Sequence, residues 1–128
     1  MEKEFIPYEQ ALAFKELGFD EPCFAFYLIN NRFNLFENCK WEERTNSGFI
    51  DLFEVKDSCC VAPTFSQAFR WFREKYDFES WVYKSRDRAY FYSVLKDNRY
   101  LNPSYEYSTY EEAELECLKK LIEIVKNK

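Results

Sequence analysis

Residues 63–95 read PTFSQAFRWFREKYDFESWVYKSRDRAYFYSVL, and this stretch decides the fold because it changes from a helical to a strand pattern. Thr64 and Gln67 have the spacing of a capping box, and apolar side chains then recur at helical spacing as far as Tyr76. After that helix, β-branched and aromatic residues flank the charged turn at residues 85–88, which is typical of an antiparallel hairpin. A helix followed by a hairpin predicts an α+β fold.

Two further helices are predicted, one near each end of the chain. Pro7 suits the first turn of a helix that ends at Gly18, because proline favours helix starts and glycine favours the position after a helix. Thr109 and Glu112 repeat the capping pattern before a last helix, which carries apolar residues at helical spacing as far as Val125. The chain is therefore expected to contain three helices.

The strands are predicted in pairs between these helices. Residues 22–30, PCFAFYLIN, are almost wholly apolar and predict a buried strand, and residues 49–55 alternate as a second strand does. Residues 31–48 between them predict either a long loop or an irregular strand. The order αββαββα describes a mostly antiparallel sheet of about four strands with three helices. Similar helix starts suggest two αββ repeats plus a closing helix, although capping rules alone would also produce that similarity.

Composition supports a single domain over residues 1–128. Apolar residues make up 47% of the chain and aromatic residues 21%, which is enough for a core without a metal or a disulfide. The five cysteines are odd in number and the N-terminus lacks the pattern of a signal peptide, so we expect free thiols and a cytoplasmic protein. So many aromatic residues also leave rings that could form a homo-oligomer interface.

Several functional classes are disfavoured by what the sequence lacks. The net charge of −5 argues against direct nucleic acid binding, and no apolar run is long enough for a membrane helix. Histidine is absent and there are only two glycines, so the usual general base and the usual phosphate-binding loops are missing. Adjacent Cys59 and Cys60 are poorly spaced for zinc. They precede a helix start, which can activate a thiol, but buried inert cysteines are more common. We expect no metal, no cofactor and no catalysis.

Cationic and aromatic side chains gather on the second helix and on the hairpin after it. Arginine binds phosphate in bidentate fashion, and tryptophan and tyrosine rings stack on bases or cap a partner surface. Helical spacing turns Arg70, Trp71 and Arg73 partly outward, so Trp71 is predicted to be exposed between two arginines. The alternative is that long arginines cover a sheet edge while aromatic rings fill the pleat. The candidate binding residues are Arg70, Trp71, Arg73, Tyr83, Arg86, Arg88, Tyr90 and, from a later tyrosine-rich stretch, Tyr105.

Three stretches of the chain resemble a family. They are FIPYEQALAFKELGFDEPCFAFY at residues 5–27, APTFSQAFRWFREKY at 62–76 and LNPSYEYSTYEEAELECLKKLIEIVK at 101–126. Together they resemble a group of small uncharacterised proteins of gut Bacteroidetes and their phages. The resemblance covers about half of the chain and implies a phage-related setting, but it transfers no activity, cofactor or catalytic residue.

Three functions are compatible with these observations. The first is a small cytosolic interaction protein of phage or prophage type, which engages a host protein, such as a defence protein, through an aromatic or acidic surface. The second is a non-enzymatic protein that sequesters a nucleotide or a cyclic nucleotide signal through its arginines and tyrosines. An enzyme of unknown type ranks last, because histidine, glycine loops and metal-ligand spacing are all missing.

Overall fold

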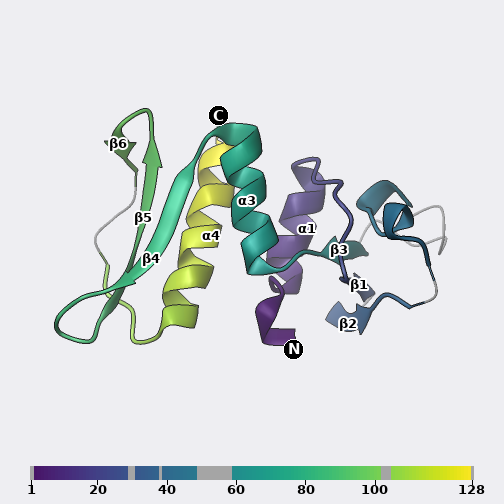
Figure 1. Ribbon diagram of the computed structural model, residues 1–128, viewed down its shortest axis with the longest axis horizontal. Coiled ribbons are helices and arrows are strands. Elements are labelled where there is room, and N and C mark those ends of the chain that lie inside the picture. The colour runs from purple at the N-terminus through teal and green to yellow at the C-terminus, as the bar shows by residue number, and fades with distance from the viewer. Residues whose placement is uncertain (1, 29–30, 38, 49–58, 102–104, 128) are drawn as a thin grey trace. The chain divides into compact units, whose positions relative to one another are not determined.

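The computed structural model describes residues 2–28, 31–37, 39–48, 59–101 and 105–127. The chain divides into two compact units, a first unit at Met1–Phe65 and a second unit at Ser66–Lys128. The predicted α+β fold is confirmed, with helices and antiparallel sheets in the order shown in Figure 1. The strands form two three-stranded sheets instead of one sheet of about four. The single domain over residues 1–128 stays a prediction.

The first unit opens with a short 3-10 helix, η1 (Glu2–Glu4), and the α-helix α1 (Tyr8–Glu16). Pro7 precedes α1 as predicted, and Gly18 follows it with a φ of 93°, a left-handed conformation that glycine adopts without strain. The amides of Gly18 and Phe19 donate to the carbonyls of Lys15 and Phe14, which is the Schellman pattern. The rings of Phe14 and Phe19 then pack 5.4 Å apart and fix the exit of the chain.

The sheet of the first unit has the order β2-β1-β3, with both pairings antiparallel. Its strands are β1 (Ala25–Leu28), β2 (Arg32–Leu35) and β3 (Cys60–Ala62). The segment between β2 and β3 contains a further 3-10 helix, η3 (Trp41–Glu43). The irregular-strand alternative for residues 31–48 is thus partly confirmed by β2. β3 was not predicted, and the strand predicted at residues 49–55 lies outside the described residues.

Two buried side chains join distant parts of the first unit. The Tyr27 hydroxyl donates to the Ile6 carbonyl at 2.8 Å, and burial raises its pKa to about 12. The side-chain amide of Asn46 donates to the Phe19 carbonyl at 2.7 Å, and its oxygen accepts from the Val61 amide at 3.0 Å. Asn46 therefore links the end of α1 to β3 through hydrogen bonds shielded from water.

The second unit contains most of α3 (Phe65–Tyr76), followed by the sheet β4-β5-β6. Its strands are β4 (Glu79–Lys84), β5 (Tyr90–Lys96) and β6 (Arg99–Tyr100), and both pairings are antiparallel. The predicted hairpin is therefore confirmed. Its turn closes with Arg88 at a φ of 62°, and Asp97 and Asn98 both have positive φ in the two-residue turn before β6.

The last helix, α4 (Tyr110–Lys126), begins where the capping pattern predicts. The Thr109 hydroxyl accepts a hydrogen bond from the Glu112 amide at 3.1 Å. The buried stripe of the helix includes Cys117, Leu118 and Leu121 and packs against β4 and β5. Figure 1 shows α4 lying along these two strands. One face of the β4-β5-β6 sheet is thereby covered by a helix.

Candidate functional site

The two faces of the β4-β5-β6 sheet differ in burial because successive side chains point to opposite sides. Even-numbered residues of β5, such as Tyr92 and Val94, are buried on the side of α4. Odd-numbered residues of β4 point the other way, and Trp81 and Tyr83 remain 42% and 44% exposed. No described helix of the second unit covers this second face, which we call the outer aromatic face.

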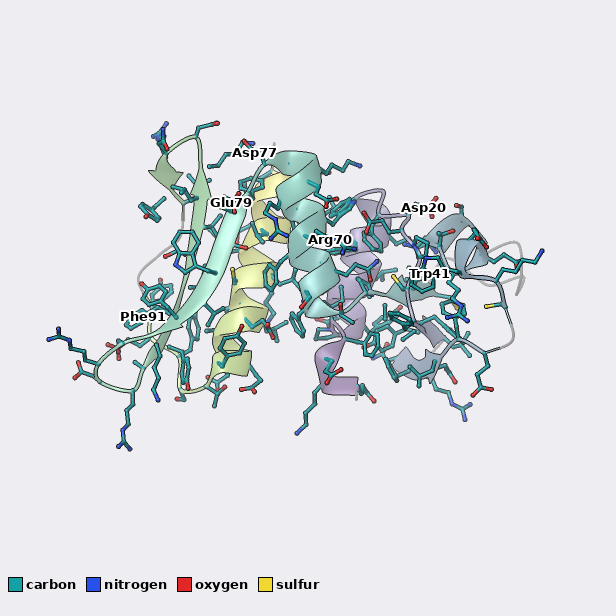
Figure 2. The ribbon with its side chains drawn as sticks, in the orientation of Figure 1. Asp20, Trp41, Arg70, Asp77, Glu79 and Phe91 are labelled. Atoms are coloured by element: carbon teal, nitrogen blue, oxygen red, sulfur yellow. The ribbon has the colours of Figure 1, made fainter. Side chains whose placement is uncertain are left out.

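Four rings form the outer aromatic face: Trp81, Tyr83, Phe91 and Tyr100. Tyr83 lies opposite Phe91 in the strand register, and their rings stack with centroids 5.6 Å apart. Trp81 reaches Tyr100 edge-on at 6.3 Å, and Tyr100 is 65% exposed. Figure 2 shows Phe91 on the side of the sheet away from α4. The rings pair with one another and still present wide surfaces to water, as recognition surfaces do.

The prediction that Trp71 is exposed between two arginines is wrong, because its side chain is buried. The buried positions of α3 are Ala68, Trp71 and Phe72, which are three and four residues apart and so share one face. The Trp71 ring packs edge-on against Phe72 at 5.3 Å and Tyr76 at 5.4 Å. Trp71 is therefore a core residue of α3 and no surface for a ligand.

The candidate arginines point to different places. Arg70 lies on the exposed side of α3 and forms an ion pair with Glu74 at 3.9 Å (Figure 2). Arg73 lines a cleft between α3, β4 and α4. Arg86 and Arg88 are exposed in the hairpin turn, and Arg88 lines a shallow hollow beside two carboxylates. The cleft contains only Arg73 of these four arginines, and the hollow contains only Arg88.

The candidate tyrosines are also divided between surfaces. Tyr83 belongs to the outer aromatic face. Tyr90 is half-buried on β5, and its main chain pairs with Tyr107 through two hydrogen bonds of 2.9 Å. Tyr105 is 63% exposed and lines a groove beside α4. The structure thus places all eight candidate residues but does not gather them into one site.

The groove that holds Tyr105 has a volume of about 650 Å³, and we call it the tyrosine groove. Tyr92 and Tyr107 stack in its wall with centroids 6.1 Å apart. On the α4 side, Lys119 lies 3.5 Å from Glu116, and Lys120 lies 3.5 Å from Glu123. The groove therefore joins aromatic rings to cations that already have anionic neighbours.

Burial, and then nearby carboxylates, raise the pKa of two tyrosine hydroxyls in the tyrosine groove. Burial raises the pKa of Tyr107, and the Glu116 carboxylate acts in the same direction. Burial likewise raises the pKa of Tyr92, with further contributions from Tyr107, Cys117, Glu116 and Glu123. An anion placed beside these rings would meet the same negative carboxylates.

The second groove, which we call the edge cleft, lies between α3, β4 and α4 and has a volume of about 380 Å³. Arg73 lines it from α3, Val82 from β4, and Glu114 and Cys117 from α4. Burial raises the pKa of Glu114, and the neighbouring Glu111 adds to this shift. Burial also raises the pKa of the Cys117 thiol to about 12, although a hydrogen bond from Ser80 opposes the shift.

The cysteines are free thiols, as predicted, and four of the five are buried. Cys60, at the start of β3, is fully buried, and burial raises its pKa to about 12 in spite of the nearby Lys15 ammonium. A thiol with such a pKa stays protonated at neutral pH and is a poor nucleophile. The structure therefore favours the inert alternative for Cys60, and the reactive one has no support at this position.

The described residues offer few other kinds of site. No group of three or more cysteine, aspartate or glutamate side chains among them could hold a metal ion. No helix in the described ranges is long and apolar enough to cross a membrane. No protein-family model matches the chain, and comparisons with curated proteins and with solved structures found no match.

Trp81, Phe91 and Tyr100 were absent from the sequence-based candidate set, although they form most of the outer aromatic face. The signal that could have found them is the alternation in residues 79–83, where Trp81 and Tyr83 share a face of the strand. Their exposure also depends on which face α4 covers, and that requires the tertiary structure.

Proposed function

We propose that this protein is an interaction protein that binds another polypeptide through its second unit. The observation that carries the proposal is the exposure of the outer aromatic face, where Trp81, Tyr83 and Tyr100 are each more than 40% accessible. Tryptophan and tyrosine are the residues most enriched at energetically important positions of protein interfaces. Tyr105 and the tyrosine groove extend the same kind of surface.

A polypeptide suits the charges of the second unit better than a nucleotide does. Each groove that contains a cation also contains carboxylates: Glu116 and Glu123 in the tyrosine groove, Glu114 in the edge cleft and Glu106 beside Arg88. Phosphate groups need a concentrated positive field, whereas protein surfaces carry both signs of charge. The sequestration of a nucleotide signal is therefore the weaker alternative.

The phage or prophage setting belongs to the same proposal. It is supported by the resemblance of residues 5–27, 62–76 and 101–126 to small proteins of gut Bacteroidetes and their phages. A partner in that setting is a host protein, and a defence protein is the first class to test. Binding alone would block such a protein if the covered surface were its working surface.

The test begins with the full chain as bait in a lysate of a gut Bacteroidetes strain. Any captured protein is then purified, and its dissociation constant is measured with the wild type and two variants. The double variant Tyr83→Ser, Tyr100→Ser should weaken binding by more than about tenfold, because aromatic hot spots each contribute about 2 kcal/mol. Trp41→Ser is the matched control, since Trp41 is also exposed (44%) but lies in the first unit.

Two results would count against the proposal. One is the absence of any saturable partner, and the other is equal binding by the double variant and the wild type. A thermal shift against nucleotides and cyclic nucleotides tests the alternative, because a ligand at 100 times its dissociation constant adds about 2.7 kcal/mol to the stability. Such a shift without a protein partner would favour sequestration.

A further inference from the structure

β4 forms an edge of its sheet. In the order β4-β5-β6, no described strand pairs with the side of β4 that faces away from β5. The Ser85 amide donates to the Ala89 carbonyl at 2.8 Å, so the odd-numbered residues of this strand direct their main-chain groups toward β5. In an antiparallel pair, successive residues direct their main-chain groups alternately toward the partner strand and away from it. Ser80, Val82 and Lys84 therefore direct their N–H and C=O groups to the open edge.

A second observation agrees with this alternation. Tyr90 lies opposite Lys84 in the register, and its main chain bonds on the other side, to Tyr107. A residue pair whose members bond away from each other is a non-hydrogen-bonded pair. The main-chain groups of Lys84 therefore also point away from β5. The open edge of β4 thus carries a row of main-chain donors and acceptors without a strand partner among the described residues.

The edge cleft runs beside this open edge. Its lining includes Ser80 and Val82 of β4. It also includes Ser66, Phe69 and Arg73 of α3, and Glu114 and Cys117 of α4. In the view of Figure 1, α4 lies between β4 and α3. Ser66 and Arg73 are seven positions apart, which is a rise of about 10 Å along a helix and equals about three residues of an extended chain. The cleft has the length and the volume of a site for a short strand.

We propose that the edge cleft binds an extended segment of a partner polypeptide, which adds to β4 as a further strand beside α3. The segment pairs with the main chain of Ser80, Val82 and Lys84. Because side chains of a strand alternate, one apolar side chain enters the cleft toward Phe69 and Cys117, and an acidic side chain of the segment faces Arg73. This assignment rests on the proposed function and names the form that the partner takes.

The chemistry of the cleft supports this occupant. Phe69 and Val82, which are both partly exposed, give apolar surface. Arg73 is exposed and forms no ion pair with another described residue, whereas Arg70 one turn earlier already pairs with Glu74. Burial raises the pKa of Glu114, which lines the same cleft. An acidic side chain therefore finds a free guanidinium at the Arg73 end.

A second copy of this chain fits the open edge less well. Strands in a sheet lie about 4.8 Å apart, so pairing through β4 would bring the next strand of that copy about 10 Å from β4. Residues of α3 and α4 also line the cleft beside this edge. A cleft of about 380 Å³ suits a single extended segment better than a whole sheet.

The experiment selects short random peptides displayed on phage against the full chain and measures the affinity of the enriched peptides. We expect peptides with alternating apolar residues and an acidic residue. N-methylation of the peptide main chain at alternate positions should weaken binding at least about tenfold, because it removes hydrogen bonds to β4. Methylation at the intervening positions should change the affinity by less than about twofold.

Two variants on α3 form a matched pair. Arg73→Glu should weaken the binding of the acidic peptide by about tenfold, and Arg70→Glu, which lies outside the cleft, by less than about twofold. Val82→Pro should abolish binding, since proline is tolerated at an open sheet edge but cannot donate. Val82→Thr keeps the main-chain amide and should retain peptide binding. The N-methyl series needs no variant and remains decisive if one fails to fold.

Three outcomes overturn the inference: no enriched peptide, equal tolerance of N-methylation at every position, or equal losses for Arg73→Glu and Arg70→Glu. Failure of the proposed function gives a different result. Suppose that peptide binding is lost in the Tyr83→Ser, Tyr100→Ser double variant and kept in the cleft variants. In that case the proposal of polypeptide binding stands, and only the edge-strand site fails. If neither peptides nor a saturable protein partner bind, both fail.

Discussion

The strands of the two units differ in the burial of their aromatic side chains. In the first unit, β1 is the central strand, and Ala25, Phe26 and Tyr27 are all buried although they alternate in direction. In the second unit, β4 is an edge strand with one covered face, and Trp81 and Tyr83 stay exposed. The comparison teaches that an aromatic residue of a strand becomes core or surface according to whether its face of the sheet is covered.

High pH should destabilise both units alike, and this is the largest expected effect. Cys60 in the first unit and Cys117 in the second both have pKa values raised from 9.0 to about 12 by burial. Because the pKa is raised in the folded state, the protonated thiol contributes its full stabilisation below pH 9. This contribution is lost as the pH rises toward 12. The loss is on the order of 4 kcal/mol per thiol.

Urea denaturation from neutral to alkaline pH measures this loss. Cys60→Ala and Cys117→Ala should each flatten the alkaline decline in the free energy of unfolding by a similar amount. Cys39→Ala is the control, because Cys39 is not fully buried. An unchanged alkaline slope in both buried-thiol variants would contradict the burial assigned to them.

Truncating a buried ring of the first unit should cost far more than truncating an exposed ring of the second. Phe14 is completely buried and packs on Phe19, so Phe14→Ala should lower the free energy of unfolding by about 3 to 5 kcal/mol. Tyr83 keeps only its stacking on Phe91, so Tyr83→Ala should lower it by about 1 kcal/mol. Denaturation monitored by circular dichroism compares the two, and similar losses would remove the contrast between the units.

Asn46 tests whether buried polar links matter in the first unit. Asn46→Ala leaves the Phe19 carbonyl and the Val61 amide without their partner, and should cost about 2 to 3 kcal/mol. Asn34 is the matched control, because its side chain donates to the Arg32 carbonyl at an exposed position. Asn34→Ala should cost about 0.5 kcal/mol or less. Equal effects in denaturation would show that Asn46 is not shielded from water.

The smallest of these effects concerns the start of α4 in the second unit. Thr109→Ala removes the hydrogen bond to the Glu112 amide and should cost about 1 kcal/mol. Thr109→Ser keeps an accepting oxygen and should be nearly neutral. The free energies of unfolding of both variants check this, and a loss of the same size in the serine variant would assign the effect to packing of the threonine methyl group.

Local signals were the part of the fold that could be predicted. The helix boundaries at Gly18 and Thr109 follow from hydrogen bonds that close within a few residues. The turn at residues 85–88 is equally local. β3 was missed because Cys60 and Ala62 form only a short strand, whose partner β1 lies more than 30 residues earlier in the chain.

The candidate site was predictable only in its residue types. Arginines and aromatic rings do lie on α3 and the hairpin, but the arc of α3 predicted to face outward wrongly included Trp71. The buried arc runs through Ala68 and Trp71, which makes Trp71 core and leaves Arg70 and Arg73 outside. Their separation into different surfaces depends on side-chain direction relative to neighbouring elements, and periodicity alone does not fix that direction.

The sequence by itself determined the α+β class, the helix starts and stops, the hairpin and the free state of the thiols, because capping, turn chemistry and composition act over short distances. Only the tertiary structure decided that the strands divide into two sheets, that α4 covers one face of β5, and that β4 keeps an open edge beside Arg73. These outcomes depend on contacts between residues far apart in the chain. No local pattern encodes which strand will lie at an edge.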